Sequence, residues 1–214
     1  MTDGTGTIGV IVAGGRSSRM GGNEKAFLAL AERPMIQVAL DRLRRQTDTV
    51  IINANGDPER MAFLGVPIQK DIFGGFAGPL AGVHAGMQWV RHNQPKASHI
   101  CTIAADTPFF PADLAARLED SCKTAGTIVL AASNGFRHPV FGLWPVSLIE
   151  DLAAFLQSGQ TGKVMAFVKQ HDWTEAEFDN LNADGNSIDP FFNINTPDEL
   201  ELARQLQEQI DIDE

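Results

Sequence analysis

A glycine-rich, cationic loop that follows an apolar run is the first feature of this sequence suited to chemistry. Residues 10–25 read VIVAGGRSSRMGGNEK, and the first of them continue a β-branched run typical of a buried strand. Glycine lacks a Cβ, so a backbone rich in it can turn several N–H groups toward an anion. The glycines are Gly14, Gly15, Gly21 and Gly22, and the cations are Arg16, Arg19 and Lys25. Together they predict a phosphate-binding loop.

Two familiar phosphate-binding motifs are absent from this loop. A P-loop requires Ser or Thr after its lysine, whereas Ala26 follows Lys25, and the GxGxxG spacing of dinucleotide-binding proteins does not occur either. An ordinary glycine-rich turn with solvated arginines remains the alternative for the loop taken alone.

Asp106 is the strongest candidate for a metal ligand. It comes just after the apolar run 98–104, which is typical of a buried strand. Mg²⁺ takes one or two protein carboxylate oxygens and completes its octahedron with water and phosphate oxygens. Asp106 can also cap the segment that starts at Thr107, and the two roles are compatible.

Asp71 and Asn53 are candidates for contacts with a nucleotide base. A carboxylate accepts from paired donors, and guanine presents N1–H beside its amino group, whereas cytosine presents its amino group beside an acceptor. Asp71 is therefore suited to selecting a purine. Either residue can instead satisfy the polar groups of its own turn, so the residue types leave both roles open.

The sequence contains no recognisable protein nucleophile. No GxSxG elbow is present, and the five histidines are scattered. We expect His138 in an irregular loop beside Pro139, where it could line the acceptor end of a cleft, and we expect structural roles for the others. Transfer to an anionic acceptor needs positioning and charge neutralisation more than a protein nucleophile.

Composition predicts one ordinary globular domain over residues 1–214. Hydrophobic residues make up 43% of the chain and charged residues 21%, without a visible repeat or domain boundary. The net charge of −10 argues against nucleic-acid or membrane partners, because such a protein repels polyanions except where cations gather locally.

Cysteine usage and the first residues favour a cytoplasmic protein. Cys101 and Cys122 form no CxxC pair, and no paired-histidine spacing suggests zinc. The apolar run after the polar start MTDGTGT is too short for a signal peptide or a membrane span.

Alternating strand and helix patterns predict an α/β fold, with a mostly parallel sheet covered by helices on both faces. We expect strands at 7–12, 49–54, 66–68, 98–104, 127–132, 139–144 and 189–195. We expect helices from Pro34 and Pro79, around 114–118, at 148–156 and 163–168, and from Pro197 to about Gln209. Ligands bind at the carboxyl ends of parallel strands, which brings the glycine loop, Asn53, Asp71 and Asp106 to one rim.

Six motifs, in order along nearly the whole chain, resemble those of molybdenum cofactor guanylyltransferases. They are VAGGRSSRMGGNEK, NAN at 53–55, GPLAG at 78–82, ADTPFFP around Asp106, HPV at 138–140 and FNINTP at 192–197. The resemblance implies a nucleotidyltransferase with a three-layer, Rossmann-like fold of the glycosyltransferase-A type.

The resemblance also implies an activity, which is transfer of GMP from GTP to molybdopterin with Mg²⁺ and release of pyrophosphate. Carried over by motif, the GTP-binding residues are Val12, Ala13, Gly14, Lys25, Asn53, Asp71 and Asp106. Gly15 joins them as part of the loop. Lys25, Arg19 and Asp106 would stabilise charge during catalysis, with Asp106 holding the metal. Asn193 and Asn195 would lie on the pterin side with His138, so the part of the chain up to about residue 110 would bind GTP and the rest the acceptor.

Some features depart from the family, and other functions remain open. Glu24 stands where the family often has Asp, and Ala105 where it commonly has Cys. The VAGG opening favours GTP over CTP. The alternatives are a CTP-using or sugar-phosphate nucleotidyltransferase, or a non-catalytic GTP-binding or pterin-carrier protein. Transient contacts with proteins that deliver molybdopterin, or with molybdoenzymes and their chaperones, are further expectations.

Overall fold

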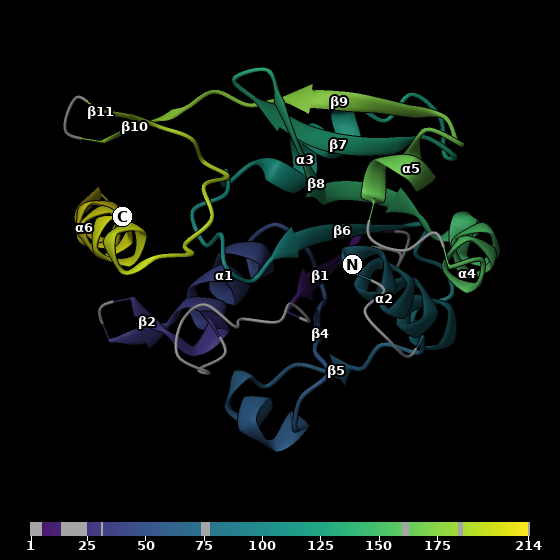
Figure 1. The fold of residues 1–214 in the computed structure, drawn as a ribbon, viewed down its shortest axis with the longest axis horizontal. Helices are drawn as coiled ribbons and strands as arrows, with labels where there is room; N and C mark the ends of the chain where they lie inside the picture. Colours follow the sequence, from purple (N-terminus) through teal and green to yellow (C-terminus); the bar gives the residue numbers. More distant parts are fainter. Residues whose placement is uncertain are drawn as a thin grey trace.

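The fold is built on a seven-stranded sheet with the order β5-β4-β1-β6-β8-β7-β9 (Figure 1). A computed structural model describes residues 6–13, 25–30, 32–73, 78–159, 163–183 and 186–213. The strands of the sheet are β1 (Ile8–Val12), β4 (Val50–Asn53), β5 (Ile68–Gln69), β6 (His99–Ala104), β7 (Ile128–Ser133), β8 (Phe136–Pro145) and β9 (Trp173–Glu177). The expected α/β class is confirmed.

Strand directions place most of the carboxyl ends at one edge of the sheet. β5, β4, β1 and β6 run parallel, β8 is antiparallel to both β6 and β7, and β9 is parallel to β7. β8 therefore begins at the edge where the six other strands end. This edge, called the rim below, points to the left in Figure 1, as the arrowhead of β9 shows.

Helices cover both faces of the sheet because successive residues of the apolar strands point to opposite faces. Ile11 and its neighbours on one face pack with α1 (Met35–Arg44) and α3 (Leu114–Asp120). Val10 and its neighbours on the other face pack with α2 (Pro79–Asn93), α4 (Ile149–Gln157) and α5 (Val164–Val168). The three-layer arrangement is thus confirmed, and both faces of the central strands are buried.

The C-terminal helix α6 (Pro197–Asp213) lies outside the three layers. Its residues Leu200, Ala203 and Leu206 pack in a separate cluster with Met35 and Val38 of α1. The helix begins with a capping box formed by Thr196 and Glu199. Glu199 N donates to Thr196 Oγ1 over 3.2 Å, and Thr196 N donates to Glu199 Oε2 over 2.8 Å.

The hairpin between β7 and β8 corrects the expectation that His138 lies in an irregular loop. Asn134 and Gly135 have φ of 52° and 77°, as in a two-residue hairpin turn, so β8 already begins at Phe136. Pairing with β7 shifts between Leu130 and Ala131, where β8 carries extra residues that include Pro139. Proline has no N–H to donate, so it fits this bulge, and His138 is a strand residue at the rim.

The expected strand at 189–195 is wrong. Asp189 Oδ1 accepts from Phe191 N over 2.9 Å, and Asp189 O accepts from Phe192 N over 3.2 Å. The aspartate therefore closes a turn, which overrides the β propensity of the two phenylalanines. The sequence expectations also lack β9 and the short pairs β2 (Ala29–Leu30) with β3 (Arg33–Pro34) and β10 (Leu181–Ala183) with β11 (Asn186–Ile188).

Three 3₁₀ segments are present among the described residues. η2 (Pro58–Leu64) joins β4 to β5 and η3 (Val146–Leu148) precedes α4, while η1 (Lys25–Phe27) follows the glycine loop. Among the described residues, no helix has the length and apolar character needed to cross a membrane. Cys101 is fully buried in β6, and its burial raises the pKa of the thiol to about 12.

Candidate active site at the rim of the sheet

Backbone bonds across three strands form the centre of the rim. Ala13 N donates to Asn53 O over 2.9 Å, and Ala105 N donates to Val12 O over 3.2 Å. Val12 and Ala13, which the family resemblance assigns to GTP, therefore lie between the end of β4 and the turn that carries Asp106.

The structure describes the residues that flank the glycine loop, up to Ala13 and again from Lys25. Gly14, Gly15 and Arg19 lie outside the described residues, and the loop resumes where Lys25 begins η1. The backbone of Lys25 is described and its side chain is not. The roles expected for these four residues stay predictions.

Asn53 and Asp71, which are 18 positions apart, are in direct contact at the ends of β4 and β5. Asn53 Nδ2 donates to Asp71 Oδ1 over 2.8 Å and to Gln69 O over 3.2 Å. Asn53 is only 1% exposed, so these bonds replace contacts with water that burial has removed. The structure thus joins the two residues expected to contact the base. The Asp71 carboxylate is held by Asn53 from the neighbouring strand and not by groups of its own turn.

Gly82 on α2 makes room for Asn53. A Cβ at position 82 would lie 2.5 Å from Oδ1 of the buried Asn53 and 3.0 Å from Cγ1 of the half-buried Val12. Gly82 lies in the GPLAG motif, so this close approach gives a physical reason for a glycine there. The α2 helix therefore fixes the positions of two expected GTP contacts.

Replacing Gly82 with alanine is expected to weaken GTP binding about tenfold, because the new methyl group displaces Asn53 from its hydrogen bonds. The greater helix propensity of alanine, about 1 kcal/mol, partly offsets the cost of crowding, so thermal stability should change less than binding. Calorimetric titration with GTP measures the effect.

Gly86→Ala is the matched control, one helical turn later on the same helix. A Cβ at position 86 would crowd Val10 at 2.9 Å and not Asn53. This variant should keep its GTP affinity even if its melting temperature falls. Equal losses of affinity in the two variants would contradict a specific link from Gly82 to Asn53.

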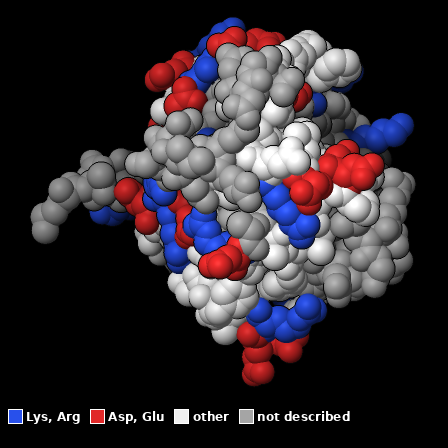
Figure 2. Space-filling view, turned by 90° about the vertical axis from the view of Figure 1, so that its left-hand side faces the viewer, with Lys and Arg blue, Asp and Glu red and all other residues white. Residues whose placement is uncertain are grey.

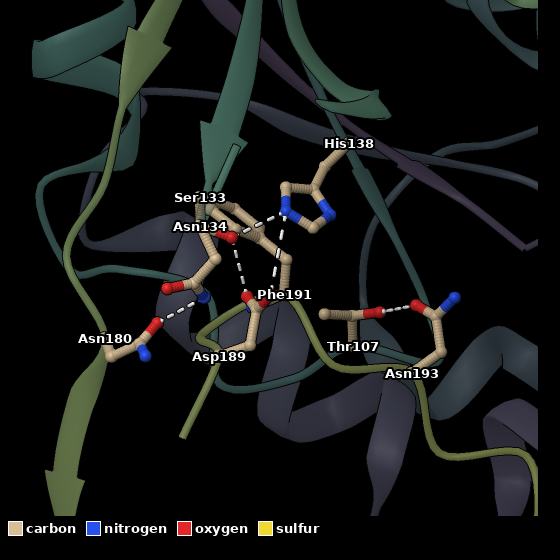
Figure 3. Close-up of polar contacts among 8 residues, drawn as sticks. All are labelled: Thr107, Ser133, Asn134, His138, Asn180, Asp189, Phe191 and Asn193. Atoms are coloured by element: carbon tan, nitrogen blue, oxygen red, sulfur yellow. Dashed lines mark hydrogen bonds and ion pairs between the residues drawn. The ribbon is translucent and has the colours of Figure 1, made fainter. Parts of the chain in front are cut away.

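Asp106 lies beside the segment 191–195, which contains Asn193 and Asn195 of the FNINTP motif that the family resemblance places on the acceptor side. Asp106 O accepts from Ile194 N over 3.0 Å, and the Asp106 side chain is half-buried. Thr107, which is fully buried, donates its hydroxyl to Asn193 Oδ1 (Figure 3). Asp106 and Thr107, at the end of β6, thus hold the segment 191–195 in place with one hydrogen bond each.

Asn195 lies two residues further along the same segment. Its backbone N donates to Glu199 Oε2 over 2.6 Å, and its Nδ2 reaches Asn193 O over 3.4 Å. The capping carboxylate of α6 therefore fixes the end of the segment that carries both asparagines.

His138 belongs to a polar cluster with Ser133 and Asp189 (Figure 3). The Ser133 hydroxyl donates to Asp189 Oδ1 over 2.9 Å and lies 2.7 Å from His138 Nε2. Since this hydroxyl has one hydrogen, His138 Nε2–H must donate to it. Phe191 stacks on the imidazole, with ring centroids 4.4 Å apart.

This cluster does not have the order of a nucleophilic triad. In such a triad, histidine lies between serine and the carboxylate and accepts the serine proton. Here the serine hydroxyl lies between the other two side chains and donates a hydrogen bond to Asp189 Oδ1. The hydrogen bond with Ser133 therefore orients the imidazole through Nε2. The ring nitrogen that does not take part in this bond is Nδ1.

Burial lowers the pKa of His138, and the nearby charges of Asp189 and Glu177 partly oppose that shift. Since the ordinary histidine pKa is 6.5, the unfolded chain binds this proton before the folded chain does as the pH falls. The stability contributed by neutral His138 is therefore complete above pH 6.5, the ordinary pKa, and is lost as the pH falls below 6.5 through the lowered pKa of the folded state.

We expect His138→Gln to reduce the pH dependence of stability in this range, because glutamine can still donate to Ser133 but does not titrate. Urea unfolding at about pH 8 and about pH 6 should show a smaller loss of stability in the variant than in the wild type. The value at the higher pH measures the structural cost of the substitution. An equal loss in both proteins would contradict the assignment.

The donor set at the rim suits a metal that binds mainly through its substrate. No group of three or more His, Cys, Asp or Glu residues that could hold a metal is present among the described residues. A single carboxylate, Asp106, matches a hard cation such as Mg²⁺, which keeps several waters and phosphate oxygens.

A groove of about 330 Å³ between α4 and α5, lined by Asp151, Phe155 and His171, involves none of the rim residues.

Figure 2 shows the side of the molecule toward which the strand ends point. Described acidic and basic side chains alternate on this face and do not form one continuous patch of either sign. The described side chains of this face therefore form no single-signed patch that would attract a polyphosphate.

Several residues that shape the rim were not predicted from the sequence. These are Asn55, Gly82, Thr107, Ser133 and Asp189. The NAN motif gave a signal for Asn55 and the GPLAG motif one for Gly82. Nothing local links Ser133 with Asp189, because the fold alone brings positions 56 residues apart into contact.

The fold and the rim define the class of the protein. The sheet is mostly parallel, with polar groups expected to contact a base at the ends of β4 and β5, a glycine loop after β1 and a metal-ligand candidate after β6. This arrangement is that of a nucleotidyltransferase. A family model described as the MobA-like NTP transferase domain matches residues 9–174. A molybdenum cofactor guanylyltransferase from Rhizobium meliloti (strain 1021) is 44% identical over 194 residues, or 91% of this chain and 88% of that protein. The chain belongs to the molybdenum cofactor guanylyltransferases.

Solved structures support the fold. The molybdopterin-guanine dinucleotide biosynthesis protein A from Archaeoglobus fulgidus is 19% identical, with a TM-score of 0.71 over 95% of this chain and 100% of that chain. A Mycobacterium tuberculosis H37Rv protein solved as a manganese complex is 17% identical, with a TM-score of 0.63 over 94% and 99% of the two chains.

Proposed function

We propose that this protein transfers GMP from GTP to the terminal phosphate of molybdopterin and releases pyrophosphate. The observation that carries the proposal is the order of groups along the rim. The Asn53–Asp71 pair, Val12 and Ala13, Asp106 and the segment 191–195 follow one another across adjacent strand ends. A base, a phosphate chain and an acceptor need this order for an in-line transfer.

In this proposal, the N-terminal part of the chain binds GTP. Asp71 accepts from guanine N1–H and from its amino group, and Asn53 supports that carboxylate. The loop residues Gly14 and Gly15 direct N–H groups at the phosphates, while Lys25 and Arg19 neutralise the charge that develops on pyrophosphate.

The part after about residue 110 binds the acceptor, with His138, Asn193 and Asn195 as its polar contacts. An oxygen of the pterin phosphate forms a bond to the α-phosphorus of GTP as the bond to the β-phosphate oxygen breaks. The attacking oxygen is already anionic, so the chain's own residues need only orient it and exclude competing water.

Asp106 would hold Mg²⁺, which when bound neutralises phosphate charge. The half-buried carboxylate fits that ion, since it supplies one hard oxygen ligand beside the expected phosphates. Because GTP and molybdopterin are the proposed substrates, we expect the protein in the cytoplasm, in brief contact with proteins that deliver molybdopterin or receive the finished cofactor.

Pyrophosphate release by the purified protein tests the proposal. GTP, Mg²⁺ and molybdopterin together should release pyrophosphate, and omission of any one should abolish it. Faster release with CTP would indicate a cytidylyltransferase. No release in the presence of an acceptor that a known guanylyltransferase accepts would favour a non-catalytic carrier.

A further inference from the structure

Asn55, which follows β4, makes two hydrogen bonds to Asp71. Asn55 Nδ2 donates to Asp71 Oδ2 over 2.6 Å, and Asn55 Oδ1 accepts from Asp71 N over 2.9 Å. One amide group therefore binds both the carboxylate and the backbone of the same residue. Among the standard side chains, only an amide can donate and accept in this way through adjacent atoms.

The backbone gives no separate reason for asparagine at this position. Asparagine often occupies turns because it tolerates a positive φ. Among the described non-glycine residues, however, Asn134 alone has a positive φ. Asn55 is also exposed, so it fills no place in the core. Its contacts with Asp71 are what distinguish it from other polar residues.

Together with Asn53, Asn55 fixes the orientation of the Asp71 carboxylate. Asn53 Nδ2 occupies Oδ1 at 2.8 Å, while Asn55 Nδ2 occupies Oδ2 at 2.6 Å. A carboxylate offers about four lone-pair positions, so about two remain for a ligand. Because each oxygen is already engaged, the carboxylate cannot rotate freely, and the remaining positions keep fixed directions.

We infer that Asn55 is a positioning residue for base selection, which sets Asp71 to accept from two adjacent donors of a guanine base. The inference rests on the proposed function, in which Asp71 reads that base. Asn55 itself touches Asp71 and does not act on the reacting phosphates. It should therefore affect discrimination among bases more than the rate of transfer at saturating GTP.

Comparison of GTP with ITP tests this role, because the inosine base keeps N1–H and lacks the amino group. In calorimetric titrations with Mg²⁺, the wild type should bind GTP more tightly than ITP. Asn55→Ala should weaken GTP binding about tenfold, as expected for loss of a hydrogen bond to a charged group. The variant should then bind GTP and ITP with similar affinity. Asn55→Asp, which has the same shape, should lose more because its carboxylate repels Asp71.

Asn93→Ala serves as the control, since Asn93 is an exposed asparagine that bonds Trp89 O at the far end of α2. It should retain the full GTP preference. Pyrophosphate binding, measured on the same proteins, should be unchanged in the Asn55 variants.

The outcomes separate this inference from the proposed function. A wild type that does not distinguish GTP from ITP would overturn the role of Asp71, and the role of Asn55 with it. A wild type that prefers GTP, with an Asn55→Ala variant of equal preference, would overturn the positioning role alone. Parallel loss of GTP, ITP and pyrophosphate binding would also overturn it, because that pattern indicates general damage to the rim.

Discussion

Asp106→Asn should reduce GTP-dependent pyrophosphate release about 10²- to 10³-fold, as found when one charge-stabilising contact is removed from other active sites. Asparagine has nearly the same size and leaves the backbone bond from Ile194 in place. The substitution therefore removes the negative charge and preserves the turn. Initial rates at saturating GTP, measured over a Mg²⁺ titration, should show a deficit that added Mg²⁺ does not fully restore.

Asp113→Asn is the appropriate control for this substitution. Asp113 precedes α3, makes no side-chain capping bond there and lies 4.0 Å from Arg117 across an exposed pair. Its rate should equal that of the wild type. If Asp106→Asn also kept the wild-type rate, Asp106 would not be the metal ligand.

Asp71→Asn should lower GTP affinity about 100-fold, because hydrogen bonds to a charged group contribute about 1.5–3 kcal/mol each and two are lost or weakened. The new amide also faces the amides of Asn53 and Asn55, which now approach Asp71 at 2.8 Å and 2.6 Å. One of these contacts becomes donor against donor. Binding of CTP, which does not present the same pair of donors, should change much less.

Asp57→Asn provides a control on the same connection between β4 and β5. Asp57 Oδ1 accepts from Glu59 N over 3.0 Å at the start of η2, and asparagine can make the same cap. Its GTP affinity should be that of the wild type. Equal weakening of GTP and CTP by Asp71→Asn would show that Asp71 supports the site without reading the base.

Local patterns were sufficient to predict the part of the fold that we propose binds GTP. Short β-branched runs predicted β1, β4 and β6, and proline followed by apolar residues at helical spacing predicted α1 and α2. Parallel strands joined by helices bring their carboxyl ends together whatever the details of packing. That is why Asn53, Asp71 and Asp106 could be assigned to one rim before their contacts were known.

Local patterns failed where contacts between distant segments decide the conformation. Two phenylalanines at 191–192 favour a strand, yet Asp189 closes a turn there and Phe191 stacks on His138. β9 carries charged residues at a sheet edge, and its sequence, WTEAE, has too little apolar alternation to predict a strand.

The sequence by itself determined the residue types at the rim, the α/β class and the family resemblance, because these depend on composition, spacing and motifs. Only the tertiary structure decided that β8 enters antiparallel between β6 and β7, which carries His138 to the rim beside Ser133 and Asp189. It also decided that Asn55 forms hydrogen bonds to Asp71 and that Gly82 packs closely against Asn53. Strand order and close packing depend on the whole core, so no local stretch specifies them.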